Sequence, residues 1–334
     1  MASQCTNIII TGAGGLIGPL LASRLLNEPQ YRVWLTDIVE PIVPPGVQYP
    51  EHAKCMQGDI GDASFVSALV SDASDHHSTK LGAVFIFHGI MSAGSEANHE
   101  LSLRVNVDSV RGMLDHLRRV QPGVRVIYAS SQAVYGQPLP AVVTDAVTPT
   151  PQGTYGAHKL MTEIYINELH RRGFIDAFCL RFPTISVRPG KPTQAASSFL
   201  SGIIREPMNG QQCVIPLEDR SFRSFLSSPS TLAENLMRVL RMDSDALPPH
   251  IRHINIPGIS VSIQELMDAL AKHGGEDKLA LLKEETDPQL ERILRSWAND
   301  FDLTTQMKLG LAVDKTAEGI VKEYIDNLKQ QQKN

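Results

Sequence analysis

The sequence predicts an α/β fold: a doubly wound parallel sheet with helices on both faces and a smaller, interleaved C-terminal lobe. Short apolar runs rich in β-branched residues alternate with helically periodic segments through about the first 190 residues, as in successive βαβ units. A glycine-rich turn joins the first of these runs to the first helix. The chain of 334 residues is long enough for one large core or for two lobes.

The chain opens with a strand, a glycine turn and a helix. Residues 7–11 are an apolar run typical of a buried strand, and the leucines after residue 15 recur at helical spacing. Between them stand three glycines, three residues apart. Such glycines let the backbone approach a pyrophosphate at the helix N-terminus, although an ordinary tight turn is the alternative. The residues expected to contact a dinucleotide here are Gly12, Gly15, Leu16, Ile17 and Gly18.

Acidic residues follow the next two predicted strands. Asp37 ends the strand over residues 32–37 and lies 19 residues after Gly18, close to the offset at which an acid accepts the hydroxyls of an adenine ribose. An acid there repels a 2′-phosphate, which favours NAD over NADP, although Asp37 could also be an ordinary polar residue closing a strand. Asp59 and Ile60 follow the next short strand. Asp59 could accept from the adenine amino group or simply close a turn.

Two further strands bring polar residues to the expected ligand edge of the sheet. His88 and Gly89 follow the fourth predicted strand, at the carboxyl end where open α/β sheets bind ligands. Ser130 and Ser131 follow the fifth predicted strand in the same way. A serine at this place can donate to a substrate oxygen, or it can bond its own backbone.

A tyrosine and a lysine lie four residues apart in a predicted helix. Tyr155 and Lys159 therefore project from the same helix face. A phenol with a pKa of about 10 is a poor base at neutral pH, whereas a neighbouring ammonium group lowers that pKa. The pair could therefore take a proton from an alcohol or return one. By spacing alone, a solvated helix face is the commoner explanation.

Taken in order, these motifs resemble the extended short-chain dehydrogenase/reductase family, in its NAD-dependent epimerase/dehydratase type. The resemblance rests on the glycine turn, Asp37, the Ser-Ser-x-x-Val-Tyr-Gly segment and the Tyr-x-x-x-Lys pair, and it covers about the first 190 residues. It implies a Rossmann fold, a bound nicotinamide dinucleotide and a catalytic Ser-Tyr-Lys centre. In that pattern Ser131 is the serine, Lys159 also bonds the nicotinamide ribose, and Asn106 helps to hold a proton-relay water. Pro183 is carried over as a further cofactor contact.

The segment after residue 180 resembles the D-erythronate dehydrogenase branch of that family. The similarity rests on residues 181–192, 195–199 and 205–207, and on later matches that include Arg223. Thr184 stands where sugar-nucleotide enzymes usually carry asparagine, which weakens an epimerase interpretation.

Three cations lie near the expected mouth of the active site. Arg188, Lys191 and Arg223 could bind a carboxylate, because a fixed cation with a planar fork matches that group. Each arginine could instead bond backbone carbonyls or an acid of the protein. The expected substrate-binding residues are Ser130, Ser131, Tyr155, Thr184, Arg188, Lys191 and Arg223.

The two lobes are expected to be interleaved in sequence. The cofactor-binding lobe comprises residues 1–182 and 226–257, and the substrate-binding lobe comprises residues 183–225 and 258–330. Residues 331–334 form a polar tail that is expected to fray.

Several helices and one charged segment are also predicted. Long helices are expected over residues 98–120 and 155–172, and these are surfaces through which relatives dimerise, so a homodimer is expected. An amphipathic helix is predicted over residues 261–273, whereas the charge-rich segment 276–285 could be mobile.

Composition narrows the class of partner. The net charge of −5 argues against nucleic acid, and no window approaches the length of a membrane span. Four scattered cysteines without a C-x-x-C pair favour a reducing, cytoplasmic setting and no metal site. The Asp75-His76-His77 cluster is interpreted as a surface loop.

The function expected from the sequence is NAD-dependent oxidation of a secondary alcohol in a small sugar acid such as D-erythronate. A carbonyl reductase for a bulkier ketone and a nucleoside-diphosphate-sugar epimerase are the alternatives with related chemistry. A non-catalytic Rossmann regulator that senses NAD is the alternative of another class.

Overall fold

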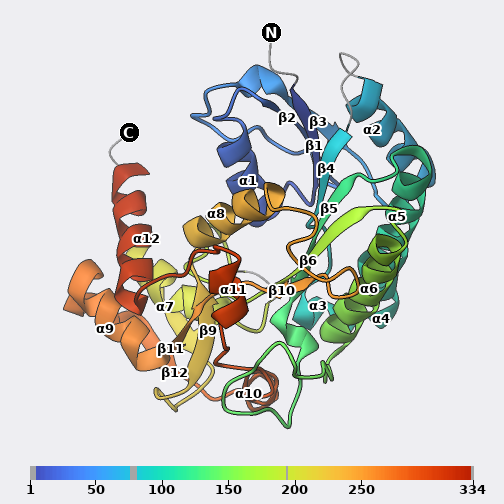
Figure 1. The fold of residues 1–334 in the computed structure, drawn as a ribbon. Helices are drawn as coiled ribbons and strands as arrows, with labels where there is room; N and C mark the ends of the chain where they lie inside the picture. The colour runs from blue at the N-terminus through green and yellow to red at the C-terminus, as the bar shows by residue number, and fades with distance from the viewer. Residues whose placement is uncertain (1–4, 76–80, 193–194, 332–334) are drawn as a thin grey trace.

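Figure 1 shows the computed structural model, which describes residues 5–75, 81–192 and 195–331. In the described part of the chain, seven parallel strands form one sheet in the order β10-β6-β5-β4-β1-β2-β3. The order runs outward in both directions from β1 and β4, so the predicted doubly wound parallel sheet is confirmed. The strands are β1 (Thr6–Thr11), β2 (Tyr31–Asp37), β3 (Ala53–Gln57), β4 (Leu81–Ile86), β5 (Arg125–Ser131), β6 (Asp176–Phe182) and β10 (His253–Asn255).

Helices cover both faces of this sheet. They are α1 (Ile17–Leu25) and α8 (Pro229–Leu240) on one face, and α2 (Ala63–Asp75), α5 (Ser109–Val120) and α6 (Thr154–Arg171) on the other. Successive strand side chains point to opposite faces. Ile8 and Ile10 of β1 therefore pack into the core with α1 and α8, and Ile9 packs into the core on the other side.

The helix predicted over residues 98–120 is interrupted, which corrects that prediction. After α3 (Ser92–Ala97), Asn98 caps α4 (His99–Leu103) by accepting from the Leu101 N–H at 3.0 Å. A π-helical turn over Arg104–Asp108 then separates α4 from α5. Such a turn accommodates an extra residue, and here it contains the buried Asn106. The Asn106 carboxamide bonds the backbone of Ile90 in the loop after β4.

A second region lies at the left of Figure 1, around two small sheets. One sheet contains β7 (Thr184–Ile185), β9 (Arg223–Ser227) and β11 (Ile259–Ser262), and the other pairs β8 (Cys213–Ile215) with β12 (Leu282–Glu284). The helices that follow β6 and flank these sheets are α7 (Ser198–Met208), α9 (Ile263–Gly274), α10 (Pro288–Arg295), α11 (Thr304–Lys308) and α12 (Ala317–Gln331). The division of the chain into a cofactor lobe and a substrate lobe stays a prediction.

Two local predictions in this region are wrong. The helix expected from Val261 begins at Ile263, because Val261 pairs in β11 and Ser262 forms a capping box with Glu265. The charge-rich segment 276–285 is ordered, as a 3₁₀ turn over Glu276–Leu281 followed by β12. Its charged side chains face outward while Leu279 and Leu282 pack against the core.

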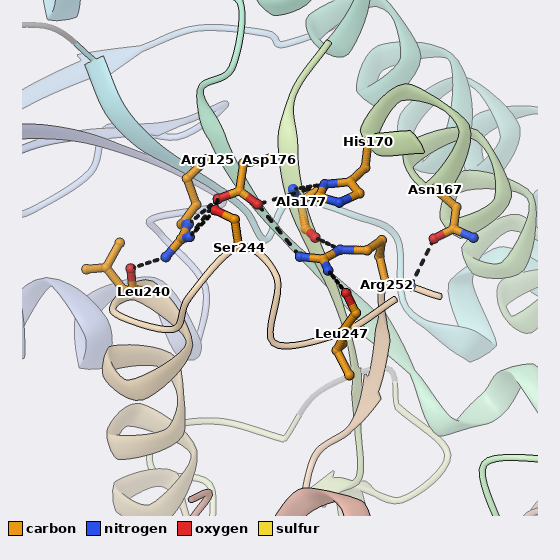
Figure 2. A network of polar contacts seen from close by, with 9 residues as sticks. All are labelled: Arg125, Asn167, His170, Asp176, Ala177, Leu240, Ser244, Leu247 and Arg252. Carbon is orange, nitrogen blue, oxygen red and sulfur yellow. Dashed lines mark hydrogen bonds and ion pairs between the residues drawn. The ribbon is translucent and has the colours of Figure 1, made fainter. Parts of the chain in front are cut away.

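A polar network joins the amino-terminal ends of β5 and β6 to the segment before β10 (Figure 2). Asp176 accepts from the Arg125 Nη2 at 2.6 Å and from the Ser244 hydroxyl at 2.7 Å. Its second carboxylate oxygen lies 3.7 Å from Nη2 of Arg252, and the Arg252 side chain is 0% exposed. Arg252 also donates to the Ala177 carbonyl at 2.8 Å. One carboxylate therefore holds together segments that are far apart in sequence.

Some predictions concern residues outside the described ranges. His76 and His77 lie outside them, as do residues 332–334 of the predicted tail, whereas Gln331 closes α12. Among the helices described here, none combines the length and apolar character needed to cross a membrane.

Candidate active site

A cavity of about 340 Å³ opens at the carboxyl ends of the central strands. It brings together residues that are widely separated in sequence. Among the residues predicted to contact the cofactor, those that line the cavity include Gly12, Gly15, Leu16, Ile17, Gly89 and Pro183. Among the predicted catalytic and substrate-binding residues, those that line the cavity are Ser130, Ser131, Tyr155, Lys159, Thr184 and Arg188.

The glycine turn forms one end of the cavity. Gly12 has a φ of +70°, and a Cβ atom there would lie 2.5 Å from the backbone nitrogen of His88, so no larger residue fits without a shift. No side chain caps the first turn of α1 at Leu16, which leaves its backbone N–H groups available to an anion. The Gly14 N–H donates to Asp37 Oδ2 at 2.9 Å. The backbone N–H groups of the first turn of α1 fit the phosphates of a dinucleotide, and the Asp37 carboxylate beside the turn fits a ribose.

The other predicted cofactor residues lie around the cavity rather than on its wall. Asp59 Oδ1 accepts from the Gly61 N–H at 2.7 Å, as expected of an aspartate that closes a turn. Ile60 is buried in the core. A Cβ atom at Gly18 would lie 2.6 Å from the Ala13 Cα, so this glycine allows α1 to pack on the turn.

His88, predicted as a cofactor contact, is not among the residues that line the cavity, and its ring bonds other parts of the protein. One ring nitrogen lies 2.7 Å from Thr11 Oγ1 and the other lies 3.0 Å from Ser109 Oγ. Burial lowers the pKa of this imidazole to about 3, with a further contribution from Lys159. The ring is therefore neutral and joins β1 to α5, and only the His88 backbone approaches the glycine turn.

Ser131, Tyr155 and Lys159 meet on one wall of the cavity. Lys159 lies one turn after Tyr155 on α6, and its Nζ is 5.5 Å from the centre of the tyrosine ring. The Lys159 ammonium donates to the Ala129 carbonyl at 2.7 Å. The Ser131 hydroxyl hydrogen-bonds the Tyr155 phenol, and its oxygen also accepts from the Ala133 N–H at 3.1 Å. The turn after β5 therefore fixes the serine in front of the phenol.

The charge environment of Tyr155 differs from the expectation. Burial raises the pKa of the phenol to about 12, opposed by the positive charge of Arg188 and by the Ser131 hydrogen bond. Burial lowers the pKa of Lys159 to about 7, opposed by Glu163. The phenol pKa is therefore raised in this structure and not lowered as expected, because burial outweighs the effects of Arg188 and Ser131.

Asn106 holds the loop after β4 against the lysine. Its Oδ1 accepts from the Ile90 N–H at 2.7 Å, and its Nδ2 donates to the Ile90 carbonyl at 3.0 Å and to Ser102 Oγ at 3.0 Å. A Cβ atom at Gly89 would lie 2.9 Å from Asn106 Oδ1 and 3.6 Å from Lys159 Nζ. Glycine at this position therefore lets the carboxamide and the ammonium group approach each other.

The two adjacent serines, which both line the cavity, have different partners. Ser130 donates to the carboxylate of Glu163, which is also bound by Arg181. Its hydroxyl hydrogen is therefore already used within the protein, and contact of Ser130 with a substrate stays a prediction. Burial of the Glu163–Arg181 pair, with side chains 6% and 3% exposed, explains this use, because a buried carboxylate needs every available donor.

Arg188 is the one predicted cation that the structure places on the cavity wall. It is 8% exposed, and its Nε donates to the Ile185 carbonyl at 2.8 Å. The Nη2 lies 3.5 Å from Ser197 Oγ. Thr184 lies on the same wall, in β7.

Arg223 and Lys191 are not among the residues that line the cavity, and their contact with a substrate stays a prediction. The Arg223 side chain is 44% exposed and donates to the Ser260 carbonyl at 2.6 Å, with Glu265 at 3.1 Å. Its neighbours Ser224 and Phe225 in β9 line the cavity instead. Lys191 is exposed.

Sequence reasoning missed a group of side chains that complete the cavity wall. Ser92 follows the β4 loop, Gln132 follows Ser131, and Ser224 with Phe225 comes from β9. Trp297 reaches the cavity from the C-terminal part of the chain, and no local pattern indicates such a long-range contact.

The chain belongs to the NAD dependent epimerase/dehydratase family, whose sequence pattern matches residues 8–256. It is 34% identical to a D-erythronate dehydrogenase of Haemophilus influenzae, over 96% of this chain and 98% of that one. It is 33% identical to a D-erythronate dehydrogenase of Cupriavidus necator, with the same coverage. Among solved structures, a nucleoside-diphosphate-sugar epimerase of Agrobacterium tumefaciens is 30% identical, with a TM-score of 0.88 over 98% of this chain and 95% of that one.

A more distant structure shares the fold. The holo form of a GalE-like L-threonine dehydrogenase from Cupriavidus necator superposes with a TM-score of 0.81 at 20% identity, over 96% of this chain and 99% of that one. A nicotinamide dinucleotide is the cofactor of the family to which these findings assign the chain.

Proposed function

We propose that this protein is an NAD-dependent dehydrogenase that oxidises a secondary alcohol of a small sugar acid such as D-erythronate. The observation that carries the proposal is that Ser131, Tyr155 and Arg188 all line one cavity. A phenol and a hydroxyl can engage a carbinol oxygen, and a buried guanidinium can bind a carboxylate. The two relatives named as D-erythronate dehydrogenases support this substrate class.

The residues of the cavity would divide the work as follows. Tyr155 takes the proton of the substrate hydroxyl, and Ser131 hydrogen-bonds the same oxygen. In the reverse direction the neutral phenol, which burial favours, returns the proton to the forming alkoxide. Lys159, with a pKa of about 7, can hold or release that proton near neutral pH. The bound nicotinamide supplies the hydride-accepting chemistry.

The cofactor is proposed to be NAD. The glycine turn and the first turn of α1 would hold its phosphates, and Lys159 would bond the nicotinamide ribose. Asp37 would accept the adenine ribose hydroxyls from the end of β2, next to the Gly14 N–H that it already binds. A carboxylate at that place repels the 2′-phosphate of NADP. The four cysteines are all free thiols, in accord with the proposed cytoplasmic location.

An epimerase is the second candidate, because the Agrobacterium tumefaciens structure bears that name. An epimerase would keep NAD bound through purification and produce no net reduced cofactor, whereas a dehydrogenase produces one reduced nicotinamide for each alcohol oxidised.

The proposal is tested by incubating the protein with NAD and a panel of four- and five-carbon aldonic acids while following the absorbance of reduced nicotinamide. Turnover of D-erythronate or a similar acid, absent in Tyr155→Phe, is expected. No reduction with any sugar acid, together with interconversion of a sugar nucleotide, would refute the dehydrogenase and favour the epimerase.

A further inference from the structure

A closed cycle of hydrogen bonds lies behind the loop that follows β4. The Ile90 carbonyl accepts from Asn106 Nδ2 at 3.0 Å and from Ser95 Oγ at 3.1 Å. Ser102 Oγ completes the cycle, because it accepts from Asn106 Nδ2 at 3.0 Å and donates to Ser95 Oγ at 2.8 Å. The three polar residues come from α3, α4 and the π-helical turn, and they are only 0–1% exposed.

His158 contacts this cycle from α6. Its Nδ1 lies 2.9 Å from Ser102 Oγ, and the residue is 2% exposed. The hydroxyl hydrogen of Ser102 is already used on Ser95, and one lone pair of its oxygen receives the amide hydrogen of Asn106. Ser102 has one lone pair left, which can only accept. All of these bonds form together only if His158 Nδ1 carries a hydrogen and donates it, which assigns the Nδ1–H tautomer to this imidazole.

The hydrogen-bonded cycle holds the loop against the glycine turn. Asn106 Oδ1 accepts from the Ile90 N–H at 2.7 Å, so both backbone polar groups of Ile90 are bound. Two residues earlier, the backbone nitrogen of His88 would lie 2.5 Å from a Cβ atom at Gly12. Gly89, between them, lines the cavity together with Gly12. Because the loop and the turn are in close contact, a shift of the Asn106 carboxamide changes the space that both leave for a cofactor.

We propose that His158 is a positioning residue for the bound nicotinamide dinucleotide, because its Nδ1–H fixes Asn106 through Ser102. The Asn106 carboxamide in turn fixes Ile90 and so places Gly89 at the cavity. The inference rests on the proposed function in that NAD is the cofactor that binds there. The competing explanation is that His158 only fills space between α6 and α4, in which case its hydrogen bond has no effect on the cofactor.

The backbone of Asn106 has a separate contact with α6. The Thr162 hydroxyl donates to the Asn106 carbonyl at 3.1 Å. This bond does not depend on the His158 side chain, so substitutions of the histidine leave the π-helical turn tied to α6 while its carboxamide loses support. The effect of such substitutions on the cofactor can therefore be measured in a folded protein.

The tautomer can be measured directly in the native protein. The measurement uses nitrogen–proton correlation spectra of protein labelled with nitrogen-15 at histidine, at about pH 8. Burial and the neighbouring His99 lower the pKa of the His158 imidazole, opposed by Asp108 and Glu96, so the imidazole is neutral there. A protonated Nδ1 and an unprotonated Nε2 are expected. A neutral His158 that carries its hydrogen on Nε2 would overturn the inference.

Binding of NAD to the nucleotide-stripped protein tests the consequence. His158→Leu removes the donor and should weaken NAD affinity about fivefold in a fluorescence titration, which is what one hydrogen bond contributes to an equilibrium constant. His158→Asn places an amide nitrogen near the position of Nδ1 and should bind NAD as the native protein does. His250→Leu, at an exposed histidine, is the matched control. An equal loss in both His158 variants, or a loss in neither, would overturn the inference.

Removal of the acceptor provides a second arm. Ser102→Ala covers the case in which His158→Leu fails to fold, and it should weaken NAD affinity at least as much as the leucine variant does. The double variant should lose no more than Ser102→Ala alone, since the histidine acts through the serine. Native NAD affinity in Ser102→Ala, or additive losses in the double variant, would overturn the inference.

None of these measurements needs a substrate, which separates the inference from the proposed function. Failure to oxidise any sugar acid would refute the proposed dehydrogenase and leave the tautomer and the NAD affinities as expected. Oxidation of sugar acids with native NAD affinity in both His158→Leu and Ser102→Ala would refute the positioning role alone.

Discussion

Replacing Lys159 with methionine should stabilise the folded protein near neutral pH. The lysine is 3% exposed, and burial lowers its pKa from 10.5 to about 7. Since a difference of one in pKa corresponds to about 1.4 kcal/mol, keeping this lysine charged in the fold costs on the order of 5 kcal/mol below pH 7. Methionine has a similar unbranched stem and carries no charge, so Lys159→Met removes that cost.

The stabilisation should depend on pH in a defined direction. Between about pH 7 and pH 10.5 the folded lysine is neutral while the unfolded lysine is still protonated. The unfolded state therefore binds more protons, and the free energy of unfolding of the native protein rises with pH through this window. Below pH 7 the lysine is charged in both states and the full cost is present. The advantage of Lys159→Met should accordingly be largest below pH 7 and shrink as the pH approaches 10.5.

Urea unfolding of the nucleotide-stripped protein at several pH values measures this advantage. Lys308→Met, at an exposed lysine, is the control, and it should show no comparable pH dependence. A gain in unfolding free energy from Lys159→Met that stays constant from pH 6.5 to 9.5 would refute the conclusion that Lys159 carries a buried charge. A variant less stable than the native protein at every pH would refute it as well.

Four further predictions address the site, the cofactor, the fold and the assembly. Tyr155→Phe should lower kcat by about 10²–10⁴-fold with unchanged NAD affinity by fluorescence titration; unchanged turnover would remove the tyrosine from the chemistry. Asp37→Ser should raise the ratio of NADP to NAD kcat/KM, and a ratio that does not move would deny the ribose contact. Asp176→Asn should cost about 3–5 kcal/mol in urea unfolding, because Arg252 and Arg125 lose their shared carboxylate; a loss no larger than that of the exposed Asp326→Asn would contradict this. Light scattering should give twice the 36.7 kDa chain mass, and a monomer mass would exclude the homodimer.

The nucleotide end of the fold follows from local sequence. Residues 7–18 contain an apolar strand, a turn that only glycine can make at Gly12, and a helix without a side-chain cap. Each feature is specified by neighbouring residues, so alternation and spacing suffice to predict it. The helical register that unites Tyr155 and Lys159 is local in the same sense.

The errors arise where distant segments decide the outcome. The π-helical turn over Arg104–Asp108, whose Asn106 bonds the distant Ile90 backbone, interrupts a helix that periodicity alone predicts as continuous. Ser130 and Ser131 are adjacent in sequence, and only the position of Glu163 on α6 distinguishes their roles. Arg223 faces outward because β9 pairs with β11, which the sequence pattern of β9 does not reveal.

The pKa values of the site residues were the feature hardest to predict from the sequence. Spacing correctly places Lys159 next to Tyr155, yet it carries no information about burial. Burial decides that the lysine is only partly charged near neutral pH. It also decides that the phenol is favoured in its neutral form, with Arg188 as the opposing cation.

A crystal structure of Tyr155→Phe with NAD and D-erythronate tests the central claim most directly. The account predicts the sugar-acid hydroxyl at Ser131 Oγ, in front of the ring at position 155, with its carbinol carbon facing the nicotinamide and its carboxylate on Arg188. An acid bound elsewhere, or one whose carboxylate lies away from Arg188 with its hydroxyl remote from the nicotinamide, would contradict it.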